Sequence, residues 1–421
     1  MKIDRRTFLQ TAGAATAAAA LPSVGHSATG SAPCRLILVN VGGGWDISYA
    51  LDPKPGVATV DSPEGEIRDF SGLPIFTHES RPNVTAFFEQ WAPRTSLIHG
   101  LGMRSISHIT CAQKLFTGKS SSASPDAGAI VAHEMAGELP LPYLVLGSVA
   151  FAGPLGVSTG RVGTINQISA LLPPGDSFPD IPQFRHERFE PNSEDEALIR
   201  KFIDGRTECE AATRGARGYN KKRIDDFRES LLKSDAIRSR AGGFGDLSFA
   251  FSLSEQADFA VQALSEDLCW TVGLDTLEDW DTHGNNEEQT YLHEGLFEGL
   301  AHLAQRLESA TGSGGNTLLD ETLVVVMSEM SRTPLLNAGG GKDHWPTTSL
   351  MMFGGPVAGG QVFGATNDLV EAELIDIGSG ALDGNGTMLE PGHVIAGIVE
   401  QAGVDAGRYI EGMESFRAPF V

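Results

Sequence analysis

An apolar run that ends in a carboxylate constrains the fold of this chain more than any other feature. Residues 322–327 read Thr-Leu-Val-Val-Val-Met, and Ser-Glu follows, with the glutamate at position 329. Such a run predicts a strand buried on both faces of a sheet, which delivers Glu329 to the sheet edge. Asp343 and His344 then follow on a glycine-rich stretch. The sequence therefore predicts acidic and imidazole groups at the end of a buried strand.

Further apolar runs alternate with segments that have a helical pattern. The runs that predict strands are residues 35–41, 96–100, 143–147 and 350–353. The segments that predict helices are residues 127–135 and 287–311, the second with leucines at a spacing of three and four. This alternation predicts an α/β fold, a three-layer sandwich with a mainly parallel central sheet. The charge-rich stretch 185–243 predicts a helical insertion into that fold.

The first residues have the pattern of an export signal. Asp4-Arg5-Arg6-Thr7-Phe8-Leu9 is a twin-arginine motif, and an alanine-rich apolar segment follows as far as Leu21. We expect residues 1–28 to be a signal peptide and residues 34–421 to form the mature domain, located in the periplasm or secreted. No later stretch is long and apolar enough to cross a bilayer. The twin-arginine route exports folded proteins, so a metal bound before export is compatible with it.

Charge and cysteine usage exclude several classes of function. The chain has 31 Lys and Arg against 54 Asp and Glu, a net charge of −23, and such a surface repels nucleic acid and anionic lipid. A polyanionic substrate needs a local positive centre, which a bound metal provides. The cysteines are Cys34, Cys111, Cys209 and Cys269. Their wide spacing excludes a thiolate zinc knuckle, and a chain this long is expected to fold without depending on disulfides.

Three more clusters carry groups that could do chemistry. Asp46 follows the glycine run 42–44 at the end of the first predicted strand, as either a ligand or a turn residue. Ser107 and His108 lie where a loop enters a helix; the serine is a hydroxyl candidate or an N-cap, and the histidine a ligand or base. Asp281 and His283 precede the long helix. Carboxylates and imidazoles on loops after strands are what a divalent metal site needs.

The order of these motifs resembles the alkaline phosphatase/sulfatase-like superfamily, and within it the twin-arginine-exported branch known as domain of unknown function 1501. The motifs that carry the resemblance are Asp-Trp-Asp-Thr-His at 279–283, Ser-Glu-Met-Ser-Arg-Thr-Pro at 328–334 and Lys-Asp-His at 342–344. The match spans about residues 34 to 400. It implies an alkaline phosphatase-like α/β fold.

The resemblance also implies a metal site and roles for its residues. Catalytic members bind two divalent metals, usually zinc, or one calcium, so we expect zinc, with calcium or manganese as alternatives. Asp281, His283 and His344 resemble ligands of one metal, and Asp46 and Glu329 occupy further ligand positions. Asp343 is either a ligand or a support for His344. The nucleophile position falls on His108, with Ser107 one residue earlier, and Arg332 has the planar fork that suits a sulfate or phosphate.

Two functional hypotheses follow from these expectations. The first is an exported metal-dependent hydrolase acting on a small anionic ester of phosphate or sulfate. The second is a non-catalytic metal- or anion-binding or assembly protein with a protein partner, because Met330 and His108 replace residues that catalytic members use. A redox protein is a weaker third hypothesis, since the sequence has no cofactor fingerprint.

Overall fold

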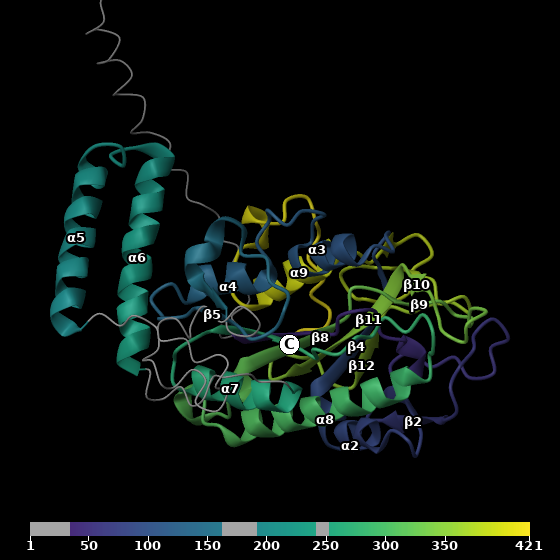
Figure 1. Cartoon of the computed structure of the whole chain (residues 1–421). Helices are drawn as coiled ribbons and strands as arrows, with labels where there is room; N and C mark the ends of the chain where they lie inside the picture. The colour runs from purple at the N-terminus through teal and green to yellow at the C-terminus, as the bar shows by residue number, and fades with distance from the viewer. Residues whose placement is uncertain (1–33, 162–191, 241–251) are drawn as a thin grey trace, which may run out of the picture. The chain divides into compact units, whose positions relative to one another are not determined.

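A sheet of eight strands organises the computed structural model, which describes residues 34–161, 192–240 and 252–421 (Figure 1). The strand order is β12-β4-β11-β8-β1-β7-β5-β6. In chain order these strands are β1 (Arg35–Asn40), β4 (Thr95–Gly102), β5 (Tyr143–Val145), β6 (Thr159–Arg161), β7 (Thr271–Asp275), β8 (Thr322–Met327), β11 (Thr347–Gly354) and β12 (Gln361–Phe363). All pairings in the sheet are parallel except those of β11, which runs antiparallel to both β4 and β8.

The two central strands are buried on both faces, as their apolar runs predict. Every residue of β1 and of β8 is buried. Successive side chains of a strand point to opposite faces, so Ile37 and Val39 pack in one hydrophobic cluster while Leu36 and Leu38 pack in another. The sheet is therefore the middle of three layers.

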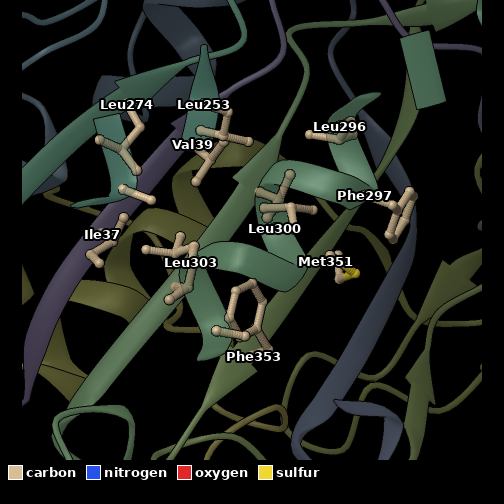
Figure 2. Close-up of a cluster of buried hydrophobic side chains, with 14 of the residues drawn as sticks. Ile37, Val39, Leu253, Leu274, Leu296, Phe297, Leu300, Leu303, Met351 and Phe353 are labelled. Atoms are coloured by element: carbon tan, nitrogen blue, oxygen red, sulfur yellow. The ribbon is translucent and has the colours of Figure 1, made fainter. Parts of the chain in front are cut away.

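Helices supply the two outer layers. One face packs against α2 (Pro82–Trp91), α7 (Leu253–Ser265) and α8 (Glu288–Ser309), and the other against α3 (His108–Thr117), α4 (Ala127–Met135) and α9 (Pro391–Gln401). In α8 the predicted stripe faces the sheet: Leu296, Leu300 and Leu303 belong to the same hydrophobic cluster as Ile37 and Phe353 of the strands (Figure 2). The α/β fold class, with a three-layer arrangement and a mainly parallel sheet, is confirmed.

The remaining elements are short strand pairs and a helical pair. The pairs are β2 (Glu66–Phe70) with β3 (Leu73–Thr77), β9 (Ser331–Arg332) with β10 (His344–Trp345), and β13 (Leu374–Ile375) with β14 (Thr387–Met388). Within the predicted insertion, α5 (Ser193–Ala212) and α6 (Gly218–Arg240) contact each other, and both are largely exposed, as its charge density predicts. The predicted signal peptide and the two ends of the 185–243 stretch lie outside the described residues.

The topology gathers the predicted functional loops at one edge of the sheet. The carboxyl ends of β1, β4, β7 and β8 share this edge, and the antiparallel β11 begins there. The loops that carry Asp46, His108, Asp281, Glu329 and His344 all leave from these strand ends. Ligand sites in open α/β sheets form at this edge, so the fold itself brings distant parts of the sequence together.

The cysteines form no disulfide. Cys34, Cys111 and Cys269 are buried and free, and Cys209 is exposed and free. The expectation that the fold does not depend on disulfides agrees with this structure.

Candidate metal centre

Three imidazole rings and one carboxylate converge at the carboxyl edge of the sheet. The Nε2 atom of His344 lies 2.9 Å from Nε2 of His108, 3.0 Å from Nε2 of His283 and 3.0 Å from Oδ1 of Asp281. Asp281 also lies 3.5 Å from His108 Nε2 and 3.1 Å from His283 Nε2. Donor atoms of His108, Asp281 and His344 all lie within 4.8 Å of one another. The sequence offered His108 as a ligand or a base, and the structure places its Nε2 atom beside those of Asp281 and His344.

The other ring nitrogen of each histidine has an acceptor of its own. Nδ1 of His108 donates to Glu329 Oε1 at 2.7 Å, and Nδ1 of His283 donates to Asp343 Oδ1 at 2.8 Å. Nδ1 of His344 donates to the carbonyl of Ile106 at 2.9 Å. Carboxylates and carbonyls only accept here, so each Nδ1 carries the hydrogen. When the rings are neutral, each of the three Nε2 atoms is therefore unprotonated and presents a lone pair.

This donor set fits a divalent metal. The Nε2 atom of His344 lies about 3 Å from two other Nε2 atoms and from a carboxylate oxygen, and these groups repel one another unless a cation or shared protons lie between them. The separations approach those between the ligands of a tetrahedral zinc, which are about 3.3 Å for bonds of about 2.0 Å. Imidazoles whose Nδ1 is held by a carboxylate or carbonyl are typical of metal sites. The donor chemistry therefore fits a divalent metal.

Glu329 and Asp343 hold the rings of His108 and His283 in position. Each carboxylate bonds the Nδ1 atom of its histidine and not the Nε2 atom that faces the other rings. Glu329 is buried and also accepts hydrogen bonds from the backbone of Gly43, at 3.0 and 3.3 Å. Its hydrogen bond raises the pKa of His108, against the opposing effect of burial. Asp343 bonds His283, whereas the sequence offered it as a ligand or as a support for His344.

Asp46 is not part of the group of mutually close donors and bonds other side chains. Its carboxylate forms an ion pair with Lys342 at 2.8 Å, both side chains being almost fully buried. It also accepts from Ser48 Oγ at 2.6 Å and from Asn286 Nδ2 at 2.9 Å. Burial opposes ionisation, but the charge of Lys342 keeps the pKa of Asp46 below its usual value. The expectation of a ligand at Asp46 is not supported by this geometry, since its oxygens are occupied.

Arg332 is buried, and its guanidinium forms hydrogen bonds with other groups of the protein. Its guanidinium donates to Asp281 at 2.6 Å, to the carbonyl of Gly44 at 2.8 Å and to the carbonyl of Lys342 at 3.3 Å, and it also contacts the carbonyl of Gly43. These bonds outweigh the effect of burial and keep the pKa of Asp281 below its usual value. The predicted role of Arg332 as an oxyanion partner is therefore not supported here; the side chain orients Asp281.

Ser107 is the N-cap of α3 and is exposed. Its backbone is extended and its side chain makes no capping hydrogen bond. Among the described residues its hydroxyl has no side-chain base beside it. The Ser107 hydroxyl is therefore exposed and forms no capping bond, and its role as a nucleophile stays a prediction.

Two features of the centre escaped the sequence analysis. Lys342 was visible in the motif before Asp343 but had no assigned role, and nothing local indicates that it pairs with Asp46. Gly43 has a φ of +119°, and a Cβ atom there would lie 2.8 Å from the backbone nitrogen atoms of Trp280 and Asp281. The glycine run after β1 is thus required for the close approach of the 280–281 segment.

The fold and this cluster define an α/β protein with a candidate metal centre at the carboxyl edge of a mainly parallel sheet. Residues 262–377 match the family described as a protein of unknown function, DUF1501, and the predicted resemblance is confirmed over this part of the chain. Residues 2–22 match the twin-arginine translocation pathway signal sequence. The protein is therefore exported to the periplasm or beyond, as predicted. No helix of the described segments is long and apolar enough to span a bilayer.

Solved structures with a similar arrangement include sulfatases and a phosphonate hydrolase. The PsFucS1 sulfatase from Pseudoalteromonas sp. is 12% identical, with a TM-score of 0.41 over 92% of this chain and 72% of that one. A putative sulfatase from Bacteroides thetaiotaomicron is 9% identical, with a TM-score of 0.37 over 90% and 75% of the two chains. The phosphonate monoester hydrolase of Agrobacterium radiobacter is 12% identical, with a TM-score of 0.34 over 90% and 78%. These likenesses carry no argument about chemistry. A search of curated proteins found no match to this sequence.

Proposed function

We propose that this exported protein binds one divalent metal, zinc by preference, and acts as a hydrolase on phosphate or sulfate esters. The observation that carries the proposal is the convergence of His108, His283 and His344 with Asp281 through lone-pair nitrogen atoms. Such a set is unfavourable without a cation or shared protons between the donor atoms. The single group of mutually close donors found among the described residues supports one metal, whereas the family resemblance implied two metals, usually zinc, or one calcium.

The residues around the centre have distinct parts in the proposed reaction. A metal held there supplies a Lewis acid that polarises an ester oxygen. Glu329 keeps the proton on His108 Nδ1 and so keeps Nε2 available as a donor atom. Arg332 fixes the orientation of Asp281. Ser107 offers the exposed hydroxyl nearest in sequence to the centre and is the nucleophile we propose.

Metal content tests the site directly. Protein purified without chelator should carry about one zinc per chain, and His344→Gln should lose most of it. His302→Gln is the matched control, because His302 also bonds a carboxylate, Asp258 at 2.9 Å, on the surface and away from any cluster. Equal metal in both variants, or none in the wild type, would exclude the site.

Turnover of aryl sulfate and aryl phosphate esters tests the chemistry separately. The wild type should hydrolyse one of these classes, and Ser107→Ala should lose turnover while keeping its metal. Loss of turnover together with metal would instead show that Ser107 is needed for the structure of the centre. Turnover that survives in Ser107→Ala would exclude the serine as nucleophile.

A non-catalytic metal-binding role is the second candidate, and a specific observation favours it. Arg332 and Lys342, the buried cations beside the centre, are both occupied by carboxylates, so neither is free to neutralise an ester. Bound metal without turnover on any ester class would support this role.

A further inference from the structure

A cavity of about 680 Å³ lies outside the candidate metal centre and has no role in the function proposed above. Its wall includes Tyr49, Ser62, His78, Arg81, Asn285 and Tyr291. Gly284 and Gly340, from the loops beside His283 and Asp343, complete one side. The cavity is therefore a neighbour of the centre, and its lining mixes polar and apolar surface.

Arg81 stands apart from the other buried cations of the described segments. Arg35 pairs with Asp267, Arg332 with Asp281, and Lys342 with Asp46, at distances of 2.6 to 2.8 Å. Arg81 is only 1% exposed and forms no ion pair with any described carboxylate. A buried charge normally has a counter-charge, because the loss of its hydration is otherwise uncompensated.

The contacts that Arg81 does make leave much of its hydrogen-bonding capacity unused. Nη2 donates to the carbonyl of Glu64 at 3.2 Å, and the buried Nε has no partner. The guanidinium lies 5.5 Å from the ring centre of Tyr49 and 6.0 Å from that of Phe76. The nearby Glu294 bonds the backbone of Asn83 at 2.9 Å instead. Burial accordingly lowers the pKa of Arg81.

We propose that this cavity is an anion subsite in which Arg81 binds the carboxylate, sulfate or phosphate group of a small molecule. An oxyanion would supply the counter-charge that the protein does not provide, and the guanidinium fork suits its geometry. His78, Ser62 and Asn285 offer further polar contacts along the wall.

The rest of the lining limits the ligand to one anionic group. Asp61, Glu64 and Glu287 also face the cavity, and they would repel a second negative charge. The volume is large enough for a small ligand to be mostly enclosed. The ligand we infer is therefore a small, otherwise neutral and polar molecule with a single oxyanion. The inference does not depend on catalysis at the metal centre.

Anion-dependent stabilisation tests the subsite without knowledge of the natural ligand. Melting temperature is measured against millimolar sodium acetate, sulfate and phosphate, with sodium chloride added to hold the ionic strength constant. The wild type should show a saturable rise with at least one of the three anions, and which anion binds best identifies the class of the group. Arg81→Gln should weaken that binding about tenfold or more.

Control variants separate this site from general salt effects and from the metal centre. Arg68→Gln removes an exposed arginine outside the cavity, paired with Glu89 at 3.2 Å, and should respond as the wild type does. His344→Gln should keep the anion response even if it loses metal. Asn285→Asp keeps the oxygen that accepts from the backbone of Glu287 but adds a negative charge, so it should weaken binding even if Arg81→Gln fails to fold. No saturable response in the wild type, or an equal response in Asn285→Asp, would overturn the proposal.

Discussion

Lys342 carries its charge at a position with no access to solvent, and Asp46 is its only ion-pair partner among the described residues. Replacement by Met keeps most of the side-chain volume but leaves a buried carboxylate without a counter-charge. We expect Lys342→Met to lower the free energy of unfolding by about 3–5 kcal/mol, measured by urea denaturation. The double variant Lys342→Met/Asp46→Asn should recover part of this loss. Additive effects of the two single variants would contradict a direct coupling of the charges.

His293 is a second residue whose burial has a measurable consequence. It is fully buried, Nε2 has no hydrogen-bond partner, and burial lowers its pKa from 6.5 to about 4. The unfolded chain therefore binds this proton at a higher pH than the folded chain does. Stability from His293 is complete above about pH 6.5 and is lost as the pH falls toward 4, by about 3 kcal/mol in total.

The pH dependence of the free energy of unfolding in His293→Gln checks this expectation. The variant should lose the slope that His293 contributes between pH 6.5 and 4, whereas His302→Gln, at an exposed histidine, should keep it. The same slope in the wild type and in His293→Gln would show that another group is responsible.

At the level of elements, the turn after β1 contacts two other segments of the candidate centre, residues 329–332 and residues 280–281. Gly43 donates to Glu329, its carbonyl contacts Arg332, and its α-carbon faces the 280–281 backbone. Gly43→Ala places a methyl group against that backbone at a φ of +119°. We expect a loss of about 1–3 kcal/mol and weaker metal binding, measured by thermal unfolding and metal content.

A substitution at Gly315 provides a control that distinguishes backbone strain from the steric clash expected at Gly43. Gly315 also has a positive φ, +89°, but a Cβ atom there would meet nothing within 4 Å. Gly315→Ala should therefore show the strain alone and keep its metal. If both variants retain metal equally, close approach at Gly43 is not what positions the Asp281 loop.

The central strands could be predicted because burial on both faces requires a continuous run of apolar residues. The hydrogen-bond and ion-pair partners of the side chains could not be predicted in this way. The runs that became β1 and β8 are continuous and apolar, so they read as strands without any tertiary information. β7 reads Thr-Val-Gly-Leu-Asp, which is too short and mixed to stand out, although it carries the chain to Asp281. The pairing of Asp46 with Lys342 joins residues 296 positions apart and depends only on the assembled sheet edge. The role of Asp343 likewise depends on how β9 and β10 reverse the chain.

At the level of the whole molecule, the candidate centre connects segments that are far apart in the chain. His108 begins α3 after β4, the 281–283 loop follows β7, and His344 precedes β11. A cation bound by all of them favours the folded state, because the unfolded chain does not bring these donors together. Metal affinity and global stability should therefore be coupled.

Chelation tests this coupling across the entire fold. A ligand at a hundredfold excess over its dissociation constant adds about 2.7 kcal/mol to the free energy of unfolding, so removal of the metal should lower the melting temperature, and added zinc should restore it. The fall should exceed the loss of the metal's own contribution, because the bare Nε2 atoms of His108, His283 and His344 then repel one another. His283→Gln removes one of these lone pairs at an exposed position, so its metal-free form should be at least as stable as the metal-free wild type. A wild type whose melting temperature does not respond to chelator or to zinc would show that the cluster is held by shared protons and not by a metal.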